Sequence, residues 1–138
     1  MRELPEPKLS LLGHMELNVA KPYLPGKTPI GTRRIIQVTG GKFEGEHFNA
    51  TVLPGGDDWI TVRADGTIIQ DVRITLETDD KELILMSYRG IRTGDPAVLA
   101  QLDNGEEVDP EDYYFRTNPI FETASEKYHW MNNRIFIS

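Results

Sequence analysis

The sequence predicts a single, mostly β domain: a small, closed antiparallel β-barrel of roughly eight or nine strands, calycin- or lipocalin-like, with one or two short helices. Apolar and polar residues alternate with a period of two over most of the chain, turn-forming residues separate the alternating segments, and strands and helices do not alternate. Closure into a barrel removes the exposed edges of such a sheet, and a β-sandwich is the main alternative. We expect one domain over residues 1–138, in which residues 1–8 form a loose N-terminal arm.

The first half of the chain supplies three of the expected strands. Residues 9–19 alternate, and they are followed by a segment with three prolines, residues 21–32, which we interpret as a long loop. Strand character resumes over residues 33–39. It breaks at Gly40 and Gly41 and continues over residues 42–53.

The middle of the chain is typical of antiparallel hairpins. A turn at residues 54–57 precedes a short strand at 59–63, and the Asp65-Gly66 pair is a strong hairpin signal. The longest regular strand is predicted over residues 67–77, and a return strand over 83–89. One face of the longest strand carries four aliphatic side chains: Ile68, Val72, Ile74 and Leu76.

The last third contains the helix signals. Asp95 is a suitable N-cap, Pro96 fits the first helical position, and residues 97–102 are good helix formers. The remaining expectations are a single turn at 109–112, an extended segment at 113–122, a turn or short helix at 125–132, and a final strand at 134–137.

Composition excludes several classes of function. The chain has no cysteine, so disulfides, thiolate nucleophiles and thiolate-bound metals are excluded. A net charge of −7 with scattered basic residues argues against nucleic acid and anionic membranes as partners. No signal-peptide pattern or membrane-length apolar run is present, which predicts a cytoplasmic protein.

No cofactor or metal is predicted. The phosphate-loop and dinucleotide fingerprints are absent, and His14, His47 and His129 lack metal-ligand spacing.

Charged side chains on the predicted strands are the first candidates for a site. Asp71 and Arg73 share one strand face, and His14 and Glu16 share another. These pairs lie either on a solvated outer wall or in a polar cavity where a carboxylate and a cation tune each other's pKa, and the sequence alone leaves both interpretations open.

The glycine-rich stretch at residues 54–59 carries adjacent carboxylates. Asp57 and Asp58 cannot both point into a dry site unless one binds a proton or a cation. The stretch is either a hairpin with a solvated acidic tip or the rim of a ligand site.

Aromatic side chains gather beside arginine and carboxamide groups in the C-terminal third. Such groups stack on flat ligands and direct donors at carboxylates, but they also serve in ordinary barrel closure. The segments are Tyr113–Arg116, Asn118–Thr123 and Tyr128–Asn132, and Arg89 and Arg92 add charge nearby.

The order of several short motifs resembles that of uncharacterised protein family 0311, also called domain of unknown function 3237. The resemblance extends from about Leu9 to the C-terminus. It implies a small antiparallel β-barrel and no agreed activity. The motifs are Gly31-x-Arg33-Arg34, Gly40-Gly41-x-Phe43-x-Gly45, Leu53-Pro54-Gly55-Gly56-x-Asp58-Trp59, Tyr88-Arg89-Gly90, Tyr114-Phe115-Arg116-Thr117-x-Pro119-x-Phe121-Glu122-Thr123 and Tyr128-x-Trp130-Met131-Asn132.

The first functional hypothesis is a metal-free acid–base enzyme, such as an isomerase, cyclase or lyase, acting on a small carboxylated or aromatic metabolite. Its proton-transfer candidates are Asp58, Glu122, His14 and Tyr114. Its ligand-binding candidates are Arg34, Arg116, Trp59, Tyr88, Trp130 and Asn132. The alternatives are a non-catalytic barrel that binds or carries a small molecule, and a structural homo-oligomer.

Overall fold

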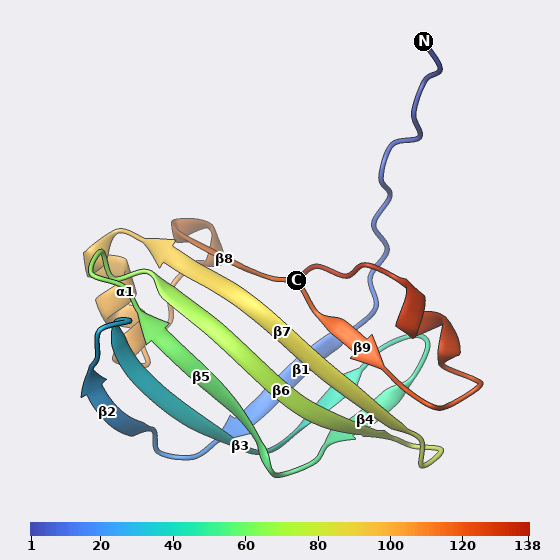
Figure 1. Cartoon of the computed structure of the whole chain (residues 1–138), viewed down its shortest axis with the longest axis horizontal. Helices are drawn as coiled ribbons and strands as arrows, with labels where there is room; N and C mark the ends of the chain where they lie inside the picture. The colour runs from blue at the N-terminus through green and yellow to red at the C-terminus, as the bar shows by residue number, and fades with distance from the viewer.

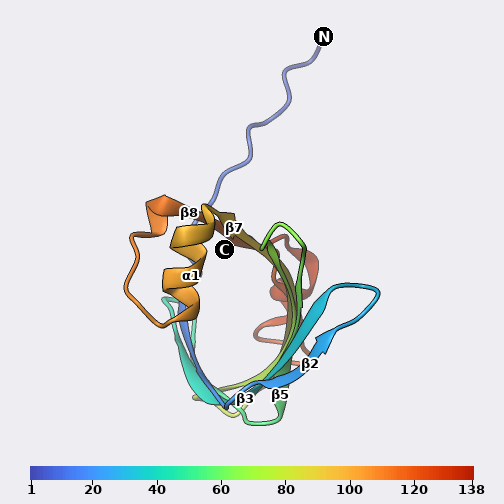
Figure 2. The same cartoon turned by 90° about the vertical axis from the view of Figure 1, so that its left-hand side faces the viewer.

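The computed structural model describes all residues from Met1 to Ser138 and contains a nine-stranded antiparallel sheet that curls into a barrel (Figures 1 and 2). The strands are β1 (His14–Val19), β2 (Tyr23–Lys27), β3 (Thr32–Glu44), β4 (Asn49–Val52), β5 (Gly56–Val62), β6 (Ile68–Thr78), β7 (Leu83–Gly94), β8 (Tyr113–Thr117) and β9 (Ile120–Glu122). The predicted mostly β, barrel-like fold is therefore confirmed.

The sheet follows the order β1-β3-β4-β6-β7-β8, with the shorter strands beside the long ones. β5 joins β3 to β6, β2 pairs with β3, and β9 pairs with β7. Because β1 and β8 are not hydrogen-bonded to each other, the barrel is not strictly closed, which corrects the prediction of full closure. The helix α1 (Pro96–Asp103) lies at the opening (Figure 2).

The helices form where the capping residues predict them. The Asp95 side chain accepts a hydrogen bond from the backbone N–H of Ala97, and α1 begins at Pro96. Two 3₁₀ turns follow, η1 (Pro110–Asp112) and η2 (His129–Asn133). None of these helices has the length and apolar character needed to span a membrane.

Two segments differ from the predictions because of proline and glycine. The predicted loop at 21–32 contains β2, which includes Pro25 but pairs only with β3, and an edge strand tolerates a residue without an N–H. The expected break at Gly40 and Gly41 is absent, and β3 continues through both. Gly41 has a φ of +143°, and a Cβ there would lie 2.1 Å from the Glu16 carbonyl oxygen, so glycine permits close approach of β1.

The two ends of the chain are less regular than predicted. The first strand begins at His14 rather than at residue 9, and residues 1–11 are exposed on an arm that leaves the barrel (Figure 1). Residues 134–137 form no strand, although Thr117 and Ser138 exchange two backbone hydrogen bonds of 3.0 Å.

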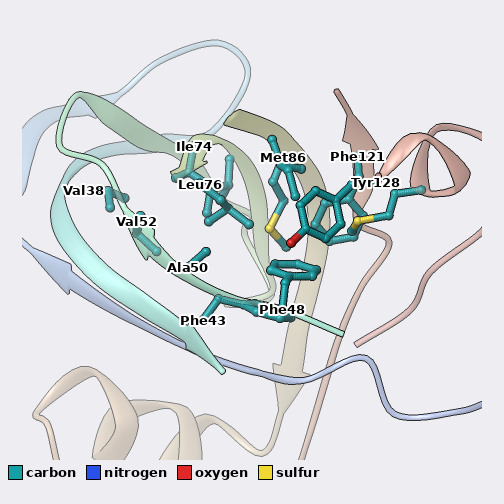
Figure 3. Close-up of a cluster of buried hydrophobic side chains, with 13 residues drawn as sticks. Val38, Phe43, Phe48, Ala50, Val52, Ile74, Leu76, Met86, Phe121 and Tyr128 are labelled. Carbon is teal, nitrogen blue, oxygen red and sulfur yellow. The ribbon is translucent and has the colours of Figure 1, made fainter. Parts of the chain in front are cut away.

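The packed core occupies one end of the barrel (Figure 3). The predicted apolar face of β6 is confirmed there, since Leu76 is fully buried beside Ile84 of β7. Phe43 and Phe48 stack with ring centroids 4.7 Å apart, and Tyr128 meets Phe48 edge to face at 5.4 Å. Toward the other end, the inward faces of the same strands carry polar as well as apolar side chains.

Candidate functional site

Polar side chains point into the barrel at the end that the core leaves open. They come from four strands, β3, β5, β6 and β7, at positions where strand alternation directs a side chain inward. These residues line a cavity of about 630 Å³: Arg34, Asp58, Gln70, Tyr88 and Arg92. Their neighbours along the same faces are aliphatic, so a polar group here is a departure from the core pattern.

Asp58 is the most buried charged residue of this cavity, with only 8% of its surface exposed. The backbone N–H of Asp71 donates a hydrogen bond of 3.2 Å to Asp58 Oδ1. Burial raises the pKa of the Asp58 carboxyl to about 6, and the hydrogen bond from Asp71 offsets part of this effect. Asp58 therefore changes its protonation state close to neutral pH, where a general acid or base is most effective.

The adjacent carboxylate is arranged differently. Asp57 belongs to the opposite face of β5, where its register partner on β6 is Arg73. The two aspartates are thus separated by strand alternation, and only Asp58 enters the cavity.

Tyr88 lies beside Asp58 in the same cavity. Burial, together with the negative charge of Asp58, raises the pKa of its phenol to about 12. The phenol consequently stays protonated at neutral pH and is a hydrogen-bond donor toward a bound molecule.

Two further polar atoms of the cavity wall are buried without a partner in the chain: Gln70 Oε1 and Arg92 Nε. Gly90 makes room for the glutamine, because a Cβ at that position would lie 2.9 Å from Gln70 Oε1. Unpaired buried polar groups are costly, so both atoms depart from the usual pattern of a satisfied interior.

An acidic residue from α1 stands at the mouth of the cavity. Arg92 Nη2 donates to Asp103 Oδ1 at 2.7 Å, and Arg34 Nη1 lies 3.7 Å from the same oxygen. Asp103 is the last residue of α1, so this carboxylate fastens the helix over the barrel opening. The two guanidinium groups already accommodate the carboxylate of Asp103, and the carboxylate of a ligand can bind them in the same way.

The arrangement supports proton transfer on a bound small molecule. Asp58 provides the titrating group, Tyr88 a neutral donor, and Arg34 with Arg92 a cationic anchor.

The structure brings three of the predicted site residues together, namely Asp58, Arg34 and Tyr88. His14 and Trp130 line a second, adjoining cavity. His14 is exposed at the edge of that cavity, and Glu16 is exposed on the same face of β1. Asp71 and Arg73 belong to the exposed face of β6, so this pair lies on the outer wall.

The other predicted residues lie elsewhere. Trp59 and Tyr114 point outward and are 47% and 54% exposed. Arg116 stacks on Tyr114, with its guanidinium carbon 5.8 Å from the ring centroid. Glu122 is exposed on β9. Asn132 fastens the C-terminal segment by accepting from the Thr123 N–H and donating to the Thr123 carbonyl.

Sequence reasoning overlooked two residues of the cavity. Gln70 lies between Ile68 and Val72 on the apolar face of β6. A polar residue that interrupts such a face indicates a polar site inside the barrel, and this signal is present in the sequence. Asp103 ends α1, and its role depends on how the helix packs, which the sequence does not specify.

Comparisons with known proteins agree with this fold. Residues 7–138 match the family model DUF3237, a protein family of unknown function. The chain is 44% identical over 122 residues to a UPF0311 protein of Clostridium acetobutylicum, covering 88% of this chain and 77% of that protein. The solved structure of a conserved protein of unknown function from Rhodopseudomonas palustris superimposes with a TM-score of 0.89 at 34% identity, covering 96% of this chain and 88% of that one.

A more distant relative carries an activity in its name. The chain is 28% identical over 127 residues to the hydroalkoxylation enzyme phnH of Penicillium herquei, covering 92% of this chain and 70% of that protein.

Proposed function

The chain belongs to the DUF3237 family, and we propose that it is a small-molecule enzyme that works by acid–base chemistry inside the barrel, with Asp58 as the proton-transferring group. The observation that carries this proposal is the placement of Asp58. It is a nearly buried carboxyl group without a cationic partner, in a cavity that also holds unpaired polar atoms. Burial of that kind costs stability, and ionisable groups buried at such a cost are concentrated at functional sites.

The reaction class follows from the groups present. An isomerase, cyclase or lyase of this type moves a proton to or from carbon or oxygen and returns to its starting state. In the addition of an alcohol to a carbon–carbon double bond, for example, the O–C bond forms, the π bond breaks, and the hydroxyl proton ends on the second carbon. One carboxyl group that gives a proton to carbon and takes one from oxygen completes such a cycle.

The name of the distant Penicillium relative supports this class, since hydroalkoxylation is an addition of this kind. We propose that the substrate carries a carboxylate, or a phenol or enol hydroxyl, held by Arg34 and Arg92. The Tyr88 phenol donates a hydrogen bond to the reacting oxygen or to the leaving group of the substrate, and Asp58 transfers the proton.

A screen followed by an isotope measurement tests the proposal. Small carboxylic acids, phenols and enols are screened by thermal shift, and each compound that binds is incubated with the protein in D₂O and followed by NMR. We expect conversion, or incorporation of solvent deuterium at carbon, with the wild type. The Asp58→Asn variant should bind the same compound and lose at least 100-fold in rate, as removal of a general acid–base typically does.

The matched control is Asp79→Asn, which removes the same charge from an exposed turn between β6 and β7. This variant should retain the wild-type rate. Ligands that bind but remain unchanged and undeuterated for days would contradict the enzyme proposal. They would instead favour the second candidate, a non-catalytic binding barrel, which the apolar lining of the remaining interior also suits.

A further inference from the structure

A second cavity adjoins the one that holds Asp58. It has a volume of about 720 Å³ and lies on the open side of the barrel, between β1 and the C-terminal segment. Its deep wall is apolar and consists largely of aromatic and methionine side chains: Met15, Phe43, Met86, Phe121, Trp130 and Phe136. A cavity of this size accommodates a drug-sized hydrocarbon or aromatic group.

The two cavities are parts of one interior. Leu17, Tyr88 and Phe115 line both, so these three side chains form the boundary between a polar and an apolar compartment. Tyr88 is half-buried at this boundary, close enough for the charge of Asp58 to affect its phenol. A ligand that crosses the boundary therefore has one end among charges and the other among aromatic rings.

The charges of the polar compartment suit a ligand with one negative charge. Arg34 and Arg92 contribute two positive charges and Asp103 one negative charge, which leaves one positive charge below about pH 6, where Asp58 is protonated. Charged groups at one end and a deep wall of apolar side chains at the other are complementary to an amphipathic monoanion.

We propose that the apolar compartment is the subsite for a bulky hydrocarbon or aromatic portion of the substrate, whose carboxylate or phenol group lies against Arg34 and Arg92. The inference rests on the proposed function in taking the Asp58 compartment as the reacting end. It adds the class of substrate: an organic monoanion with an extended apolar part, rather than a small polar metabolite.

Continuity with the Asp58 compartment favours a substrate over a second copy of the chain. Phe43, Met86 and Phe121, which form the deep wall, are each at least 94% buried and lie inside the barrel. The exposed apolar residues of the arm and the C-terminus, Leu9, Leu11, Ile135 and Ile137, border only the outer rim.

The test uses para-alkylbenzoates of increasing chain length, from benzoate to 4-hexylbenzoate, with affinity measured by isothermal titration calorimetry. We expect the wild type to bind about threefold to fourfold tighter for each added carbon, the value for transfer of a methylene group out of water, until the compartment is filled. Leu17→Trp narrows the boundary between the compartments. It should abolish this dependence.

Two further variants keep the test decisive. Leu24→Trp places the same substitution on an exposed leucine of β2, outside both cavities, and should retain the chain-length dependence. Met15→Trp fills the apolar compartment from β1 and should reproduce the Leu17→Trp result. The conclusion then holds even if circular dichroism shows that one of the two variants is misfolded.

The inference is overturned by equal affinity along the series, by absence of binding, or by chain-length dependence that survives in both Leu17→Trp and Met15→Trp. A different outcome is that the protein sediments as a dimer whose affinity for the alkylbenzoates does not depend on their chain length. That result would assign the apolar compartment to a second copy of the chain and would also overturn the inference. Chain-length-dependent binding without turnover of any screened compound would contradict the enzyme proposal and leave this subsite standing.

Discussion

Replacing Asp58 by asparagine should stabilise the folded protein at neutral pH. The substitution keeps the shape of the side chain and an oxygen that accepts the hydrogen bond from the Asp71 N–H, but it removes a negative charge from the barrel interior. Residues placed for chemistry commonly cost stability in this way, and their removal recovers it.

The magnitude follows from the shift in pKa. The carboxyl group has a pKa of about 6 in the folded state against an ordinary value of 3.8, and each pKa unit corresponds to 1.36 kcal/mol. The full shift amounts to about 3 kcal/mol, and because the group lines a cavity that admits water, we expect about 2 kcal/mol at pH 7.5.

The sign of the pH dependence is fixed by which state holds the proton. Between 3.8 and about 6 the folded state retains the proton of Asp58 while the unfolded chain has lost it. Ionisation of the unfolded chain therefore lowers the stability of the wild type as the pH rises through this window. At pH 4 the penalty of the wild type, and so the advantage of Asp58→Asn, falls to about 0.5 kcal/mol.

Thermal unfolding of the wild type, Asp58→Asn and Asp79→Asn at pH 4.0 and pH 7.5 measures this difference. For a domain of this length, about 2 kcal/mol corresponds to an increase in Tm of about 6–10 °C at pH 7.5. We expect that increase for Asp58→Asn only, and a much smaller one at pH 4.0. Equal Tm values for Asp58→Asn and the wild type at both pH values would refute the reasoning, since they would show that Asp58 is fully hydrated.

Three further predictions concern the cavity mouth, the C-terminal segment and the core. Asp103→Asn removes the carboxylate that occupies Arg92, so benzoate should bind about threefold to tenfold tighter by calorimetry. Asp80 accepts hydrogen bonds from Thr78, Lys127 and Tyr128, which hold its pKa below the ordinary value. Asp80→Asn should therefore lower Tm above pH 4, and the difference from the wild type should shrink as the pH falls from about 4 toward the lowered pKa of the folded state. Leu76→Ala should lower the free energy of unfolding in urea by about 2–5 kcal/mol, and an unchanged midpoint would mean that this fully buried side chain packs loosely.

The regular strands could be predicted because one face of each strand is buried in the barrel interior and the other is exposed to water. In β6 the alternation of aliphatic and polar residues follows directly from burial on one face, and Asp65-Gly66 marks the hairpin before it. The edge strands were harder to predict, because an edge strand needs neither a complete hydrogen-bond ladder nor a second partner strand. β2 is such a strand and includes a proline. β1 and β8 do not pair, and a helix covers the gap between them.

The site could be predicted only where a single strand carries the signal. Asp58 and Arg34 are polar residues on inward faces, but that they line one cavity depends on the pairing of β3 with β5, which a single sequence does not specify. The same limit explains Trp59 and Tyr114, which are typical of ligand sites and lie on the outer wall. Strand parity distinguishes them once one inward residue on each strand is known.

The protonation state of Asp58 is the most direct test of an acid–base site in this barrel. We would follow the side-chain ¹³Cγ signal of Asp58 by NMR from pH 3 to pH 9, with Asp58→Asn as the assignment control, alone and with a bound carboxylate probe. We expect a midpoint near pH 6 in the free protein and a shift of that midpoint when the probe binds. A midpoint near 3.8 that does not respond to the probe would contradict this expectation.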